Sequence, residues 1–130
     1  MNILQPPHWP RPKGYSNGIS AKGRMIFTAG VVGWDENESF PEFTLHGQFT
    51  QALTNTLEIL AQDGAGPQNI VRMTCYVTDR NEYLRDRDEI GTAWRKIMGP
   101  NYPAMAVLEV SGLVEPAAKV EIETTAIVEE

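Results

Sequence analysis

Two stretches with alternating side chains near the end of the sequence constrain its fold most. Residues 102–110 and 119–127 carry apolar or β-branched residues at a period of two, which is typical of β-strands. Gly112 and Pro116 interrupt the pattern between them. In the second stretch one strand face would carry Val120, Ile122, Thr124 and Ala126, and the other Glu121, Glu123 and Thr125. The last predicted strand therefore has one apolar face and one acidic face.

The two carboxylates on one face of this strand have two interpretations. A solvated sheet face ordinarily carries glutamates, so Glu121 and Glu123 fit an exposed surface. A pair of carboxylates can also perform acid–base chemistry, although a spacing of two residues is a weak signal for it. The spacing alone leaves both interpretations open.

Two helices are predicted in the middle of the chain. Over residues 45–60 an apolar stripe recurs at three- and four-residue spacing: Leu45, Phe49, Ala52, Leu53, Thr56, Leu57 and Leu60. Gly64 is expected to stop this helix. The second helix is predicted from Asn81, as its N-cap, to Met98, and Gly99-Pro100 would end it. Its charged residues 85–89 alternate in sign, which indicates a solvated face.

The remaining strands are predicted from shorter patterns. Residues 15–19 are expected to pair as a hairpin with the apolar run 24–32, turned by residues 20–23. A further strand is predicted over residues 69–78, with one face made of Val71, Met73, Cys75 and Val77. Residues 1–14 contain four prolines and are expected to form an extended arm.

These elements predict one α+β domain spanning residues 1–130. Two helices would cover one face of a single mixed sheet. The strand over residues 102–110 has apolar side chains on both faces, and the helices can cover only one of them. The other face is therefore expected to contact a partner subunit.

Composition excludes several classes of protein. No apolar run approaches the ~18–20 residues of a membrane span, and the first ten residues lack the features of a signal peptide. The net charge of -6 argues against a nucleic-acid partner. Cys75 is the only cysteine, so an internal disulfide is impossible and a cytoplasmic protein is expected. The residue itself is expected to be a buried small apolar side chain rather than a nucleophile. His8 and His46 stand alone, so neither a metal site nor a cofactor is expected.

Six motifs in order carry a resemblance to a known family. They are Gly14-Tyr15-Ser16-Asn17-Gly18, Phe27-Thr28-Ala29-Gly30, and the segments 51–60, 70–79, 102–104 and 120–123. Over residues 14–128 the chain resembles the YjgF/RidA family, also called L-PSP endoribonucleases. The resemblance implies a chorismate-mutase-like subunit and a homotrimer with a small-molecule cleft at each subunit interface. It also implies hydrolysis of a reactive enamine or imine to a carbonyl compound and ammonia.

The resemblance also implies roles for individual residues. Glu121 matches the glutamate that positions the attacking water, and Tyr15 matches the ring at the cleft entrance. Met105 stands where the family has an arginine that clamps the substrate carboxylate. The other expected lining residues are Phe27, Ala29, Gly30 and Val107, and at Ala29 a family hydroxyl is lost.

The departures leave several functions open. The clamping role could pass to Arg24 or Arg72, or the cleft could take a larger substrate, as in the 2-aminomuconate deaminases of the family. Alternatively, the protein is a non-catalytic trimer that binds a small metabolite in a cleft lined by Tyr15, Phe27, Met105 and Val107. An endoribonuclease is the weakest reading, because the chain is acidic and has no histidine pair.

Overall fold

The computed structural model describes residues 1–130 as an α+β fold built on one mixed sheet. The strands are β1 (Asn2–Leu4), β2 (Gly18–Ser20), β3 (Arg24–Phe27), β4 (Val31–Val32), β5 (Ile70–Val77), β6 (Ala104–Glu109) and β7 (Val120–Val128). The helices are α1 (Leu45–Ala61), α2 (Arg80–Arg85) and α3 (Arg87–Met98), with a 3-10 turn at Pro67–Asn69. The main sheet has the order β3-β7-β5-β6, and β4 also pairs with β7. Only β5 and β6 run parallel, which confirms the predicted mixed sheet.

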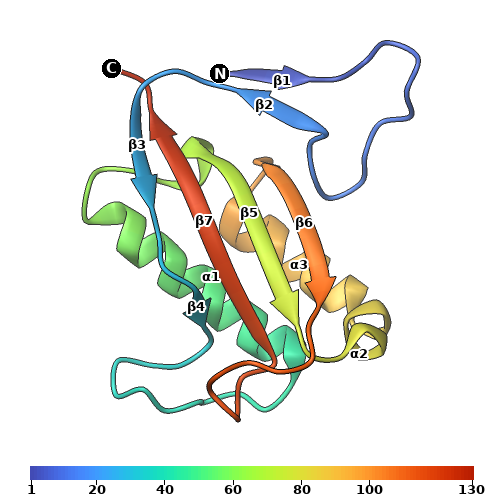
Figure 1. The fold of residues 1–130 in the computed structure, drawn as a ribbon, viewed down its shortest axis with the longest axis vertical. Helices are drawn as coiled ribbons and strands as arrows, with labels where there is room; N and C mark the ends of the chain where they lie inside the picture. Colours follow the sequence, from blue (N-terminus) through green and yellow to red (C-terminus); the bar gives the residue numbers. More distant parts are fainter.

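All three helices lie on one side of this sheet (Figure 1). We call the side that α1 and α3 cover the helix face, and the opposite side the open face. The helix face is the core, where α1 packs its predicted stripe against β5 and β7. On β7 the buried residues are Val120, Ile122, Thr124 and Ala126, as predicted, and Glu121, Glu123 and Thr125 lie on the open face. None of the helices is long and apolar enough to cross a membrane.

The predicted N-terminal hairpin is wrong. β2 pairs with β1, so residues 2–4 form a strand within the segment that was predicted to be an extended arm. Its prolines begin only at Pro6, which leaves the backbone N–H groups of residues 2–4 free to pair. β3 and β4 instead both pair with β7. Residues 28–30 separate them, so the apolar run 24–32 is two short strands rather than one.

The second predicted helix is also wrong in two respects. It begins after Asp79, whose side chain accepts a hydrogen bond from the Glu82 N–H at 3.1 Å, and it breaks at Asp86 into α2 and α3. Asp86 does not belong to a solvated face, because it is 7% exposed. Its carboxylate lies 3.1 Å from His46 Nδ1 and accepts a 3.1 Å hydrogen bond from Arg85 Nε. Both contacts lower the pKa of Asp86, and the hydrogen bond with His46 has the larger effect.

On β5 the inward face differs from the prediction at one position. The register with β7 shifts between Ile70 and Arg72. Ile70 is therefore buried, whereas Val71 is only half-buried; Met73, Cys75 and Val77 lie in the core as predicted.

Glu82 connects three parts of the fold. It is 7% exposed, and its Oε2 accepts a 3.0 Å hydrogen bond from the N–H of Leu45, the first residue of α1. Its Oε1 accepts a 2.9 Å hydrogen bond from Lys119 Nζ, just before β7. The start of α1, helix α2 and the start of β7 therefore meet at one carboxylate.

Removing this carboxylate is expected to destabilise the fold. In Glu82→Ala the Leu45 N–H and the Lys119 ammonium lose their acceptor, so the free energy of unfolding should fall by about 2–3 kcal/mol. Urea denaturation measures it, with the exposed Glu58→Ala on α1 as the control. Equal urea midpoints of unfolding for Glu82→Ala and Glu58→Ala would show that Glu82 does not stabilise the fold.

Candidate functional site

The largest cavity of the subunit has a volume of about 740 Å³ and lies on the helix face beside β6. The segment around Tyr15, helices α2 and α3, and strand β6 all contribute to its wall. Its lining residues are Lys13, Gly14, Tyr15, Phe49, Tyr83, Arg87, Asp88, Ile90, Gly91, Trp94, Arg95, Tyr102, Met105 and Val107. It is large enough for a ligand of drug-like size.

Strand register brings Met105 and Val107 into this cavity. In the parallel pair β5–β6 they lie beside Met73 and Cys75, whose side chains are buried on the helix face. Tyr15 joins them because the next residue, Ser16, bridges to Ala104 and its N–H donates to Pro103 O at 2.9 Å. Three of the residues predicted for the site are therefore brought together.

A stack of aromatic rings forms one wall of the cavity. The ring centroids of Phe49 and Trp94 are 6.4 Å apart, and those of Trp94 and Tyr102 are 6.1 Å apart with planes inclined by 16°. The Trp94 indole N–H donates a 3.1 Å hydrogen bond to Asn101 O, which fixes its ring. Because Phe49 is 1% and Trp94 5% exposed, the half-buried Tyr102 supplies most of the planar surface that this wall offers to a ligand.

Glu121 lies on the open face, on the other side of the sheet from this cavity. It is half-buried, and its register partners are Val32 on β4 and Tyr76 on β5. A Cβ added to Gly30 would lie 2.7 Å from the Glu121 carboxyl carbon and from Oε2, so only glycine leaves this carboxylate its position.

The two carboxylates of this strand face differ in their partners. Glu123 accepts a 2.7 Å hydrogen bond from the Tyr76 hydroxyl, and this bond is the main cause that raises the pKa of Tyr76. Glu121 forms no hydrogen bond or ion pair within the subunit. Of the pair that the sequence singled out, Glu121 is the carboxylate that is free to act on a ligand.

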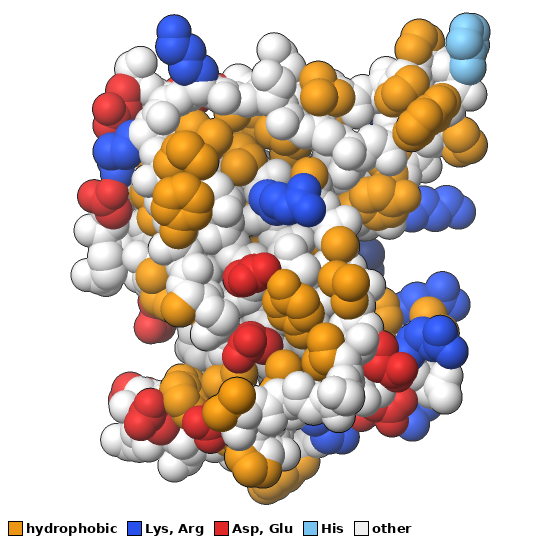
Figure 2. Space-filling view, viewed as in Figure 1, with side chains coloured by type: hydrophobic (Ala, Val, Ile, Leu, Met, Phe, Trp, Pro, Cys, Tyr) orange, Lys and Arg blue, Asp and Glu red, His pale blue; other side chains and the backbone are white.

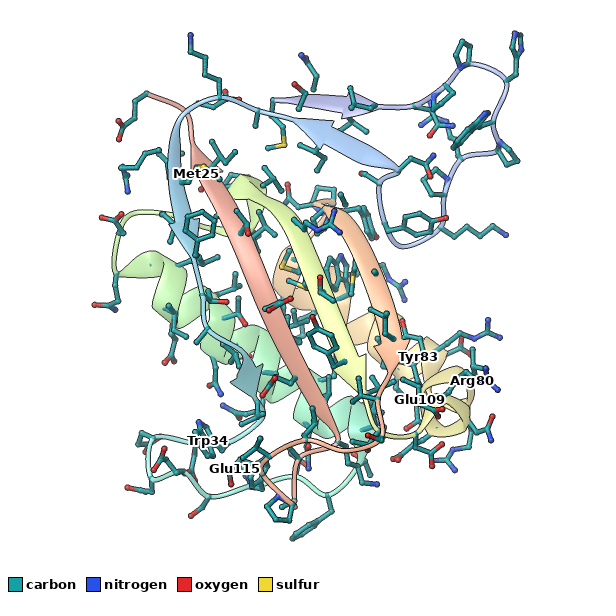
Figure 3. The ribbon with its side chains drawn as sticks, viewed as in Figure 1. Met25, Trp34, Arg80, Tyr83, Glu109 and Glu115 are labelled. Carbon is teal, nitrogen blue, oxygen red and sulfur yellow. The ribbon has the colours of Figure 1, made fainter.

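The remaining predicted residues also lie away from the large cavity. Phe27 is 66% exposed on β3, and Ala29 and Gly30 line a separate hollow of about 490 Å³. Figure 2 shows apolar side chains on the open face near β3, with acidic side chains towards the middle of that face. In Figure 3, Met25 lies at this β3 edge and Tyr83 lies on α2 beside the opposite edge. One subunit thus does not bring Phe27 or Glu121 together with Met105.

The cations considered as substitutes for the clamp do not line the cavity either. Arg24 is paired with Glu130, at 2.8 Å, and with Asp63. Arg72 alternates with the buried Met73 and lies on the open face of β5. Sequence reasoning missed Arg87 and Arg95 of α3, which do line it. The spacing of Arg87 could have revealed it, because it lies four residues after Tyr83 and three before Ile90, which also line the cavity.

The structure places neither an accessible thiol nor a cluster of metal-ligating side chains at this site. Cys75 is fully buried, and its burial raises the pKa of the thiol to about 12. No group of three or more His, Cys, Asp or Glu side chains is placed to hold a metal ion. Among the residues predicted to form the site, Glu121 alone has a carboxyl group.

Comparison with known proteins assigns the chain to a family. The profile described as Endoribonuclease L-PSP matches residues 9–128. A RutC family protein of Synechocystis is 30% identical over 130 residues, covering 98% of this chain and 96% of the relative. A human relative named 2-iminobutanoate/2-iminopropanoate deaminase is 28% identical, covering 80% of this chain and 73% of the relative.

A solved structure supports the same assignment. The YyfB protein of Yersinia pestis, described as a protein of unknown function of the Rid family, superimposes with a TM-score of 0.86. It is 27% identical, and the match covers 98% of each chain. The chain therefore matches this fold over nearly its whole length.

The buried thiol gives a direct test of the packing beneath β6. With a pKa of about 12, Cys75 is almost entirely protonated at pH 8, and its side chain is inaccessible. We expect the native protein to react with a thiol-specific disulfide reagent only after denaturant is added. Rapid stoichiometric labelling of the native protein would contradict this packing.

Proposed function

The chain belongs to the endoribonuclease L-PSP family, also called the YjgF/RidA family, and on this premise we propose that it is an imine or enamine deaminase. It would hydrolyse a C=N bond and release a carbonyl compound and ammonia. The observation that carries the proposal is the free carboxylate of Glu121, which is half-buried above Gly30. The name of the human relative, 2-iminobutanoate/2-iminopropanoate deaminase, supports this class of reaction.

In the proposed reaction Glu121 moves protons between water and the leaving nitrogen. The carboxylate removes a proton from a water molecule as its oxygen bonds to the imine carbon, and the C=N electron pair passes to nitrogen, which takes up a proton. The resulting carbinolamine then passes its hydroxyl proton through Glu121 to the nitrogen, so that a carbonyl group forms while the C–N bond breaks and ammonia leaves. A carboxylate without a hydrogen-bond partner in the subunit suits both transfers, because its oxygens are free to accept a proton and to pass it on.

We further propose that the site is completed between subunits of a homotrimer. Glu121 lies on the open face and Met105 on the helix face of the same sheet, so one subunit cannot apply both to one small molecule. A neighbouring copy whose cavity edge at β6 packs on the open face of the first subunit would set that cavity against Glu121 of the first subunit. The exposed Met25, Phe27 and Leu108 are apolar residues that such a copy would cover.

The cavity favours a substrate larger than 2-iminopropanoate. Met105 cannot form the paired hydrogen bonds of an arginine, and Ala29 offers no hydroxyl. A cavity of about 740 Å³ with an aromatic wall accepts a longer unsaturated substrate, in the manner of a 2-aminomuconate deaminase. A small-metabolite-binding trimer without catalysis is the second candidate, and the same loss of polar anchors at Met105 and Ala29 favours it.

Substitution of the proposed catalytic carboxylate tests the reaction. Glu121→Gln retains the shape of the side chain but cannot accept a proton, so we expect a loss of roughly 100-fold or more in ammonia release. The substrates are enzymatically generated 2-iminopropanoate and 2-aminomuconate. Glu123→Gln, two residues away on the same face, is the matched control and should retain most activity. Ammonia release that survives in Glu121→Gln would exclude the mechanism, and none in the unmodified protein would favour the binding function.

The assembly is tested by molar mass in solution. Light scattering should give a mass near three times 14.5 kDa for the unmodified chain. Phe27→Glu places a charge on the apolar open face and should dissociate the trimer, whereas Phe43→Glu, in the loop before α1, should not. A monomeric unmodified chain would rule out a site shared between subunits.

A further inference from the structure

The large cavity carries more positive than negative charge, although the chain as a whole is acidic. Lys13, Arg87 and Arg95 line it against the single carboxylate of Asp88, while the whole chain has a net charge of -6. None of these three cations forms an ion pair within the subunit. Asp88 also lines a second hollow on α3, which places it at the rim. Unpaired cations beside an aromatic wall indicate an anionic ligand.

Arg87 and Tyr83 both line the cavity with hydrogen-bond donors that have no acceptor within the subunit. Its Nε donates a 3.2 Å hydrogen bond to Leu84 O, which orients the side chain, and its terminal nitrogens have no acceptor. Burial is the main cause that raises the pKa of Tyr83, and Cys75 adds to this effect. The positive charge of Arg87 acts in the opposite direction. The Tyr83 hydroxyl, like the terminal nitrogens of Arg87, forms no hydrogen bond within the chain.

Arg95 lies at the other end of the same helix face and is less available. Its Nη1 would be 3.2 Å from a Cβ at Gly91, so the guanidinium folds back over that glycine. Its Nη2 lies 3.4 Å from Thr92 Oγ1. Arg87, Gly91 and Arg95 follow at intervals of four residues along α3, and all three line the cavity.

We propose that Arg87 of α3, together with the Tyr83 hydroxyl, binds the substrate carboxylate in place of the arginine that β6 lacks at Met105. The substrate class is an imine or enamine of a carboxylic acid with a planar, aromatic or extended unsaturated side chain. This inference rests on the proposed function for the reacting group and adds the anchor and the shape of the substrate.

The apolar part of the cavity specifies this side chain. Met105, Val107 and Phe49 provide no hydrogen-bonding group that a polar side chain could use. The Trp94 indole N–H is already bonded to Asn101, and its buried ring supports the half-buried ring of Tyr102, which lines the cavity. A planar apolar group can stack on this wall while the carboxylate reaches Arg87.

Binding of three probes to the full chain tests the inference without catalysis. Phenylpyruvate has both the carboxylate and the aromatic group, phenylacetone lacks the carboxylate, and pyruvate lacks the ring. Isothermal titration calorimetry should rank phenylpyruvate as the tightest ligand. In Arg87→Gln its affinity should fall roughly 10- to 100-fold, while that of phenylacetone stays unchanged. Arg87→Lys, which retains the charge but not the fork, should recover part of the loss.

Arg80→Gln is the matched control, because it removes the same charge from α2 outside the cavity. It should bind all three probes like the unmodified chain. The inference is overturned if phenylpyruvate does not bind, if Arg87→Gln weakens phenylacetone equally, or if Arg80→Gln weakens phenylpyruvate as much as Arg87→Gln does. Selective binding without ammonia release from any substrate would refute the proposed function but retain the anchor.

Discussion

The alternation of side chains along β7 is the constraint on which the rest of this structure depends. Val120, Ile122, Thr124 and Ala126 close the core against α1, and the same period forces Glu121 onto the open face. A shift of one residue would bury Glu121 and expose the core, so fold and site share one register. The same rule on β6 directs Met105 to the opposite side. The sheet thus separates the free carboxylate from the large cavity.

The helices on the other side of the sheet hold the cavity wall in place through buried carboxylates. Glu82 binds the start of α1 and Lys119, and Asp86 contacts His46 at the junction of α2 and α3. Tyr83 lies between these two anchors in sequence, and Arg87 follows directly after them. The contacts of Glu82 and Asp86 therefore stabilise the fold and also position Tyr83 and Arg87, the residues that we propose bind the substrate.

Strong periodic patterns made most of this fold predictable. Helix α1 and strands β5, β6 and β7 were predicted because each has a long run with one period. The pairing of β3 with β7 was not, because it joins residues about a hundred positions apart and no local pattern records it. At the break, Asp86 contacts His46 of another helix, and propensity cannot reveal such a contact. At the site, Tyr15, Met105 and Val107 line one cavity, whereas Arg87 was hidden in a charge run that fits solvent equally well.

The central claim is that each site combines the open face of one subunit with the cavity of the next. Mixing two inactive variants tests it most directly. Glu121→Gln chains retain Arg87, and Arg87→Gln chains retain Glu121, so trimers reassembled from both contain some sites with both groups intact. For a ring with equal mixing, ammonia release at low substrate concentration should return to about a quarter of the unmodified rate. A mixture no more active than its two components measured separately would contradict a site shared between subunits.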